Sequence, residues 1–203
     1  MRSILLSFAT IVLVLNSSAQ TEMDNCKTTG LQFSFNGLYL GTLSAGVGGK
    51  TWISDGTCLV LSIAGSHNYS STDSSFSQPG STTTSTLVQI QFGAEWHFDQ
   101  VASFSPFLAA AVFGRYEKRL SEYVYPQAPI AEQVSNTATV GLNVGLGAEY
   151  WIAKRLSLSG QHLFQVSYAK GTHEYEKAPI ANYVTRGFNI GLGTSSLILT
   201  LYF

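Results

Sequence analysis

The histidines are the first residues of this sequence to test for chemistry. The four of them, His67, His97, His162 and His173, are scattered, and no two show the HxH or HxxxH spacing that brings two ring nitrogens to one metal ion. We therefore expect them to line the fold or to lie in loops. The sequence predicts no metal site and no cofactor site.

Nucleophilic catalysis is the second chemistry to consider. Ser66 and Ser70 lie close to His67, but no acidic residue is clearly placed with them. A catalytic triad needs a nucleophile, a base and an acid that converge at one point. Serine is abundant in this chain, so chance explains the proximity, and the sequence indicates no enzyme.

The two cysteines leave two interpretations open. Cys26 and Cys58 fit an oxidising compartment, where they could form a disulfide, and they could equally be free thiols. Met23-Asp24-Asn25 before Cys26 is not a lipoprotein cleavage sequence. Lipid attachment at Cys26 is therefore not expected.

The charge of the chain excludes one class of partner. Only 11% of the 203 residues are charged, and the formal net charge is -1. Proteins that bind nucleic acid carry a basic surface that neutralises phosphates, and this chain has none to offer. The length suits a single domain or one closed barrel.

The first residues have the layout of a secretory signal. Arg2 gives a positive start, residues 4–15 are mostly apolar, and Ser17-Ser18-Ala19 provides small residues at a cleavage site before Gln20. The apolar run is well short of the roughly 20 residues that a transmembrane helix needs. We expect a signal peptide over residues 1–19 and a mature domain over residues 20–203.

The mature chain alternates between apolar and polar residues, the pattern of strands with two different faces. The clearest case runs from Val88 to Phe98, where every second residue is apolar and those between are mostly polar. No later apolar run could cross a bilayer as a helix, although 45% of all residues are hydrophobic. Any membrane crossing must therefore use strands, which satisfy their backbone groups in lipid only by closing into a barrel.

A soluble sandwich would also alternate, but three features favour a membrane barrel. The strands are on the order of 10 to 15 residues long, where about 5 or 6 is usual. Aromatic residues gather at strand ends, as in the girdles of outer-membrane barrels. The chain ends in an alternating strand that closes on an aromatic residue, with Leu199, Leu201 and Phe203 on one face.

An internal repeat gives the number of strands. A glycine followed by aromatic residues recurs, with equivalent glycines at Gly48, Gly93, Gly147 and Gly193. Each interval would hold two strands and their connections, so four copies predict eight strands. Short connections are expected at residues 54–56, 99–103 and 153–155, and long polar loops at residues 70–85, 120–136 and 171–183.

Two strands need a specific interpretation. The Asn36-Gly37 pair is a strong hairpin signal, so we expect strand one over residues 27–35 and strand two over residues 38–53. The last segment, from Arg186 to Phe203, is expected to be one strand. Its apolar face switches between even and odd positions, which predicts a β-bulge near Ser195.

The signal peptide, the alternating strands, the glycine repeat and the terminal Phe203 together resemble the OmpX/OmpA-type family of small outer-membrane barrels, over residues 27–203. The resemblance implies an all-β, eight-stranded, antiparallel up-and-down transmembrane barrel in the bacterial outer membrane. It also implies contact with outer-membrane lipid and lipopolysaccharide, and with the barrel assembly machinery through the terminal strand. OmpA-type proteins often carry a peptidoglycan-binding domain after the barrel, which is not expected here.

An eight-stranded barrel has an interior that side chains can fill. We expect polar residues there to pair with one another, since an unpaired buried charge is costly. A narrow polar path through the interior is the alternative. The candidates for the inner face are Gln89, Gln91, Glu95, Arg115, Glu149, Gln161 and Gln165.

The function expected from the sequence is structural or interaction-based, carried by the external loops and an external partner. Tyrosines in these loops would suit recognition, because they give large contact area at low entropy cost. They would equally suit anchoring at the lipid headgroups. A narrow channel, or a lipid A-modifying enzyme with a serine near His67, is the alternative function. The tyrosines are Tyr69, Tyr123, Tyr125, Tyr175 and Tyr183.

Overall fold

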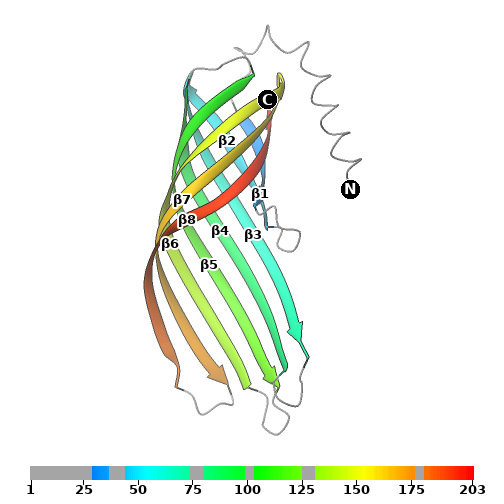
Figure 1. The fold of residues 1–203 in the computed structure, drawn as a ribbon, viewed down its shortest axis with the longest axis vertical. Coiled ribbons are helices and arrows are strands. Elements are labelled where there is room, and N and C mark those ends of the chain that lie inside the picture. The colour runs from blue at the N-terminus through cyan, green and yellow to red at the C-terminus, as the bar shows by residue number, and fades with distance from the viewer. Residues whose placement is uncertain (1–28, 37–43, 74–79, 99–102, 125–130, 177–180) are drawn as a thin grey trace.

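Eight antiparallel strands close into a barrel (Figure 1). The computed structural model describes residues 29–36, 44–73, 80–98, 103–124, 131–176 and 181–203. Each strand pairs with the next along the chain, and β8 pairs with β1. The expected eight-stranded up-and-down barrel is confirmed. The strands are β1 (Thr29–Asn36), β2 (Ser44–Ser54), β3 (Thr57–Thr72), β4 (Gly80–His97), β5 (Phe104–Val124), β6 (Ala131–Ala153), β7 (Leu156–Glu176) and β8 (Tyr183–Tyr202).

Part of the sequence lies outside this description. The expected signal peptide over residues 1–19, and Cys26, fall outside the described residues. Among the residues that are described, no helix is long and apolar enough to cross a membrane.

Apolar side chains cover the outside of the barrel and polar ones the inside. In β6, Leu142 and Val144 are each 55% exposed, while Asn143 between them is 5% exposed. In β4 the same contrast separates Phe92 and Trp96 from Glu95. A water-soluble domain buries its large apolar residues and exposes few of them in one patch. The arrangement is therefore inverted relative to a soluble sandwich.

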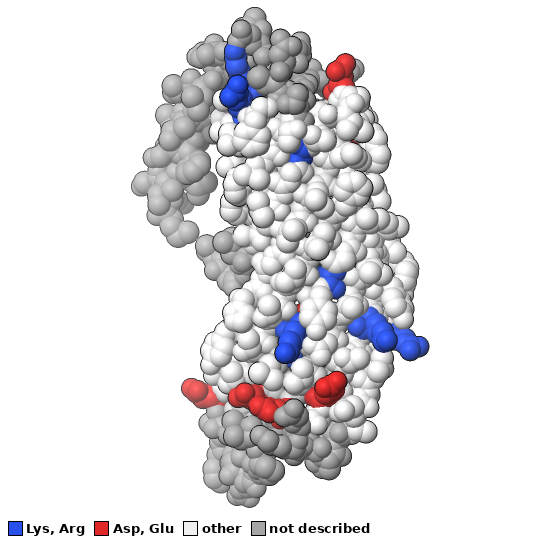
Figure 2. Space-filling model, turned by 180° about the vertical axis from the view of Figure 1, so that it is seen from behind, with Lys and Arg blue, Asp and Glu red and all other residues white. Residues whose placement is uncertain are grey.

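One stretch of the outer surface carries no charged side chain on the face shown in Figure 2. It lies between charges near one end of the molecule and charges further along it. This stretch coincides with the outward rows of Val, Leu, Ile and Phe in the strands. We call it the apolar band.

The two ends of the barrel differ. Two-residue turns join β2 to β3 and β6 to β7 at one end, where the C-terminus also lies (Figure 1). We call this the turn end, and the opposite one the loop end. Towards the loop end, β3 from Ser66 to Thr72 pairs with β4 alone among the described residues, and β8 from Tyr183 to Leu192 pairs with β7 alone. Six strands, β3 to β8, therefore continue past β1 and β2.

This extension is named the projecting sheet. Its boundary follows the strand pairing from β3 to β8: each residue in the following list pairs with the next one. The residues are Ser66, Leu87, Glu117, Thr137, Gly171 and Thr185. It consists of residues 66–72, 80–87, 117–124, 131–137, 171–176 and 183–185.

The projecting sheet corrects the expectation of three long polar loops. Residues 70–85, 120–136 and 171–183 are mostly strand, and the connections shrink to residues 73–79, 125–130 and 177–182. Alternation signals a strand only where its two faces meet different environments. Beyond the apolar band both faces are polar, so the signal vanishes, although threonine and tyrosine there favour strands.

The expected first hairpin is also wrong. Asn36 pairs with Ser44, so β2 begins at Ser44 and not at residue 38, and residues 37–43 between them lie outside the described residues. A turn at Asn36-Gly37 would pair odd positions of β1 with even positions of β2. In the structure, Phe33 pairs with Val47, and both point outwards. With the turn at Asn36-Gly37, Phe33 would instead pair with an inward residue, because a shift of one residue in register exchanges the two faces of a strand.

The last strand follows the expectation. β8 is continuous, and between Leu192 and Ser195 it holds one residue more than β7 holds between Phe164 and His162. The bulge predicted near Ser195 is therefore confirmed, and the outward face changes there from even to odd positions.

Glycines on the inner wall make room for large apolar side chains. A Cβ atom at Gly147 would lie 2.3 Å from the Phe107 ring, and one at Gly141 would lie 2.7 Å from the Phe113 ring. Phe107 is fully buried, and Phe113 is 5% exposed. At Gly147, one of the repeated glycines, the missing side chain thus leaves room for Phe107, and the interior is only partly polar.

Candidate functional site

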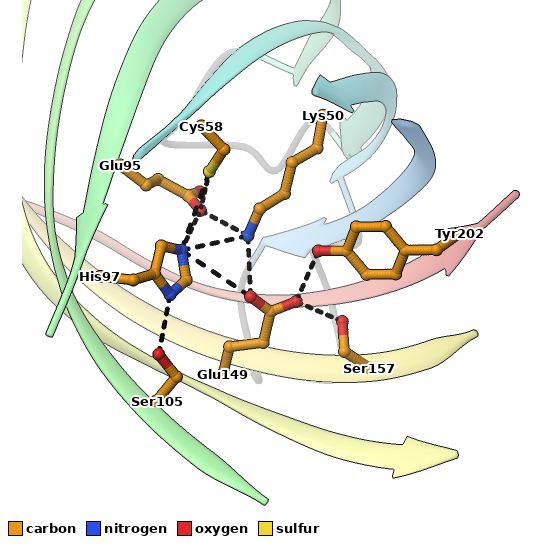
Figure 3. A network of polar contacts seen from close by, with 8 residues as sticks. All are labelled: Lys50, Cys58, Glu95, His97, Ser105, Glu149, Ser157 and Tyr202. Atoms are coloured by element: carbon orange, nitrogen blue, oxygen red, sulfur yellow. Dashed lines mark hydrogen bonds and ion pairs between the residues drawn. The ribbon is translucent and has the colours of Figure 1, made fainter. Parts of the chain in front are cut away.

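Side chains from seven of the eight strands meet inside the barrel near the turn end (Figure 3). Four ionisable groups form its centre, which we call the ionic cluster: Lys50 of β2, Glu95 and His97 of β4, and Glu149 of β6. Alternation explains the meeting, because each of these residues occupies an inward position of its strand. Around them lie Cys58, Ser105, Ser157 and Tyr202.

Lys50 bridges two carboxylates. Its Nζ lies 2.7 Å from Glu95 Oε2 and 2.8 Å from Glu149 Oε2. The side chain of Lys50 is 1% exposed, and those of Glu95 and Glu149 are 6% and 0% exposed. Charges so completely removed from water are tolerated only when each has a partner. Lys50 is the shared partner of both carboxylates.

Glu149 is held on its other oxygen as well. The Tyr202 hydroxyl donates a hydrogen bond of 2.8 Å to Oε1, and the Ser157 hydroxyl donates a second one. The Tyr202 ring in turn stacks on Trp151, with 4.7 Å between centroids. Both oxygens of the most deeply buried carboxylate are thereby satisfied, and the C-terminal strand is tied to the cluster.

The His97 ring has a fixed orientation. Its Nδ1 lies 3.0 Å from Ser105 Oγ, and its Nε2 lies 3.2 Å from Glu95 Oε2. The ring packs between Trp52 and Phe107, at centroid distances of 4.6 and 4.9 Å. Nε2 therefore faces the centre of the cluster, and only small changes in ring angle are possible.

A cavity of about 190 Å³ lies beside the ionic cluster, on its loop-end side. Glu95 belongs to its wall, and so does Arg115 further towards the loop end. Asn143 Nδ2 donates a 3.1 Å hydrogen bond to Gln91 Oε1 across this space. The interior is thus open around Arg115 and filled between Glu95 and Glu149, where Lys50 and His97 lie.

The residues proposed from the sequence for the inner face fall into two groups. Six line the cavity: Gln89, Gln91, Glu95, Arg115, Gln161 and Gln165. The seventh, Glu149, is fully buried in the ionic cluster. Sequence reasoning missed Lys50 and Tyr202. Lys50 and Trp52 are two residues apart in β2 and therefore share a face, and this signal could have placed Lys50 inside the barrel.

Two arrangements resemble parts of a hydrolase. Ser105, His97 and Glu95 form a chain of hydroxyl, imidazole and carboxylate. Ser105 is 5% exposed and is not among the residues that line the cavity beside Glu95. The other is the alternative considered at His67, whose Nδ1 lies 2.9 Å from Thr86 Oγ1 in the neighbouring strand.

The remaining described histidines lie apart from this chemistry, whereas Cys58 lies within it. His162 Nδ1 lies 2.9 Å from Ser195 Oγ at the bulge of β8, which accounts for a histidine on the apolar parity of β7. His173 stacks on Tyr183 at 4.5 Å in the projecting sheet. Cys58 is a free and buried thiol beside Glu95.

Comparisons with known proteins bear on the fold. No protein-family model matches the sequence, and no curated protein matches it. A major outer membrane protein from Thermus thermophilus matches the structure with a TM-score of 0.53 and 12% identity, over 87% of this chain and 100% of that one. The chain has the fold of a small outer-membrane barrel.

Two further solved barrels align over most of this barrel with lower scores. Acinetobacter baumannii CarO2 aligns with a TM-score of 0.48 and 10% identity, over 89% of this chain and 100% of that one. The N-terminal β-barrel domain of Pseudomonas aeruginosa OprF aligns with a TM-score of 0.41 and 11% identity, over 88% of this chain and 98% of that one.

Proposed function

We propose that this chain is an integral protein of the bacterial outer membrane, related to the OmpX/OmpA-type barrels, that binds an external partner through its projecting sheet. The observation that carries the proposal is the inverted surface: an apolar band outside a closed ring of strands. In hydrocarbon, a closed ring leaves no backbone group unpaired, and an outward apolar face contacts lipid.

The two ends suggest the orientation. Outer-membrane barrels have short turns in the periplasm and longer segments outside the cell. The turn end would then lie in the periplasm and the projecting sheet beyond the lipopolysaccharide headgroups. Leu201 and Phe203 point outwards, at 42% and 64% exposed, and with Leu199 they would form the segment that the assembly machinery recognises.

The interior supports a binding role over a diffusion channel. The ionic cluster spans the inside of the barrel near the turn end, and Phe107, Trp151 and Tyr202 fill the space around it, each at most 2% exposed. The cavity reaches this layer at Glu95. A solute that entered from the loop end would meet buried, mutually paired charges.

The projecting sheet offers two means of binding. Tyr183 stacks between His173 and Tyr175, at centroid distances of 4.5 and 6.2 Å, and Tyr69 is 67% exposed. Such aromatic side chains give contact area at low entropy cost. The edge of β3 from Ser66 to Thr72 also presents backbone groups to which an extended segment of an external protein could add as a strand.

Shortening the projecting sheet tests this proposal. We would replace residues 122–132 by Asn-Gly, which retains the Ser121–Gln133 pair of β5 and β6 and closes it with a two-residue hairpin turn. Cells that display the full protein should adhere to members of a panel of immobilised matrix proteins and glycans. Cells with the shortened protein should lose most of that adhesion.

Surface display of both proteins must be equal, and cold and boiled samples of each must migrate differently in gel electrophoresis, as folded barrels do. Equal adhesion of both displayed proteins, or adhesion of the full protein no greater than that of cells without it, would contradict the binding role.

A further inference from the structure

Three groups of different chemistry converge at one side of the ionic cluster. Cys58 Sγ lies 3.4 Å from Glu95 Oε2 and 3.7 Å from His97 Nε2, and Glu95 Oε2 lies 3.2 Å from His97 Nε2. They come from two neighbouring strands, in which Cys58 is paired directly with Glu95 and His97 is the next inward residue of β4. A thiol, a carboxylate and an imidazole thus form a triangle of donor atoms.

We propose that Cys58, Glu95 and His97 form a binding site for a divalent metal ion of the zinc type. Zinc binds sulfur at about 2.3 Å and nitrogen or oxygen at about 2.0 to 2.2 Å, in tetrahedral geometry. Two donors of such a site are then about 3.3 to 3.8 Å apart. The three measured separations agree with this range to within 0.1 Å.

Glu149 is not one of the ligands. Its Oε2 lies 3.8 Å from His97 Nε2, which is longer than the roughly 3.3 to 3.5 Å between a nitrogen and an oxygen ligand of one tetrahedral ion, and it pairs with Lys50 instead. The set of a thiolate, an imidazole and one carboxylate is borderline in softness and suits zinc better than magnesium or calcium, which take oxygen ligands.

His97 is already oriented as a metal ligand. In metal sites the second ring nitrogen of a histidine usually bonds to a neighbouring group, which fixes the ring and its tautomer. Here Ser105 Oγ, 3.0 Å from Nδ1, is that group, and Trp52 and Phe107 hold the ring from its two sides. Nε2 faces Cys58, Glu95 and the Lys50 ammonium, whose Nζ lies 3.3 Å away and would withdraw from Nε2 when the ion binds.

The charges of the site balance with a bound ion. Among the residues that the structure describes, Lys50 is the one ammonium paired with the carboxylates Glu95 and Glu149, which leaves one negative charge in excess. A divalent cation with the Cys58 thiolate adds one positive charge, so the sum becomes zero. On binding, the sulfur–metal bond replaces the sulfur–hydrogen bond, and the proton leaves to solvent. Lys50 would give up Glu95 to the metal and keep Glu149.

The ion has a way in. Glu95 belongs to the wall of the cavity, whose lining extends to Ser66 and Leu87, where β3 is no longer paired with β2 among the described residues. Water and small ions in the cavity can therefore reach one ligand directly. Cys58 and His97 lie behind it.

Cobalt, which takes zinc sites and reports on their ligands by absorption, is the probe for the test. The mature chain with Cys26→Ser, refolded in detergent under reducing conditions, has Cys58 as its single thiol. Titration with Co²⁺ should produce the near-ultraviolet band of a thiolate bound to cobalt and the visible bands of a tetrahedral ion. Equimolar Zn²⁺ should remove both.

Variants locate the ligands. Cys58→Ser should abolish the thiolate band, and Ser105→Ala should retain it while weakening affinity about 10- to 100-fold. His162→Gln, at a histidine outside the cluster, is the matched control and should change neither. Each variant is first checked for the different migration of cold and boiled samples. A Cys26→Ser protein that is folded and gives no thiolate band overturns the proposal, as does an unchanged titration in Cys58→Ser.

Discussion

Replacing Lys50 by methionine is expected to destabilise the barrel by about 3–5 kcal/mol, the usual cost of removing one partner from a buried ion pair. Lys50 Nζ is within 2.8 Å of both Glu95 and Glu149, whose side chains are only 6% and 0% exposed. Methionine fills much of the same space, so the loss would reflect charge and not a cavity. Urea unfolding in lipid vesicles, followed by tryptophan fluorescence, measures the change.

Neutralising the carboxylate left behind should reverse much of this loss. In the double variant Lys50→Met/Glu149→Gln, the new amide carries no charge but still offers an acceptor to the hydroxyl groups of Ser157 and Tyr202, and Glu95 keeps His97. The matched control is Lys118→Met, at an exposed lysine, which should change stability by less than about 0.5 kcal/mol. If Lys50→Met were as stable as this control, the ionic cluster would not stabilise the interior.

Replacing Leu142 by arginine is the second change with a large expected effect. Leu142 lies in the outward row of β6 within the apolar band and is 55% exposed. An arginine on the lipid face of an outer-membrane barrel costs about 2–4 kcal/mol near the middle of the bilayer and about 0–1 near its surfaces. We expect the unfolding free energy in lipid vesicles to fall by an amount in the first of these ranges.

The position of the substitution is the control for this prediction. Tyr69 lies in the projecting sheet and is 67% exposed, so Tyr69→Arg should cost less than about 1 kcal/mol by the same measurement. Equal costs at residues 69 and 142 would mean that both side chains meet the same solvent, and the apolar band would then not be a lipid-facing surface.

Sequence alone predicted the faces of the strands better than their lengths. Alternation along residues 88–98 depends on two environments, and the structure places Phe92 and Trp96 outside and Glu95 inside. Where both environments are polar, as along residues 66–72, the same strand leaves no alternation to read. The hairpin at Asn36-Gly37 failed for a related reason, because a local turn preference is weaker than the requirement that paired residues share a face.

The site was predictable only in part. The inward positions of Glu95 and Glu149 follow from parity within their own strands. That Lys50 bridges them depends on the register of β2, β3 and β4 and on the closure of the barrel, which bring Lys50 next to a carboxylate 99 residues away. The approach of Cys58 to His97 likewise follows from the pairing of Cys58 with Glu95. Neither pair shows a local spacing that a motif could capture.

The central claim is that the outward face contacts lipid, and Trp96 tests it most directly. Trp96 points outwards at 45% exposed, whereas Trp151 is buried inside at 2% and Trp52 packs on His97. In vesicles of brominated lipid, the acyl chains should quench a substantial part of the fluorescence of the native protein, and Trp96→Phe should remove most of that quenching. Equal quenching of both proteins, or none in either, would contradict the claim.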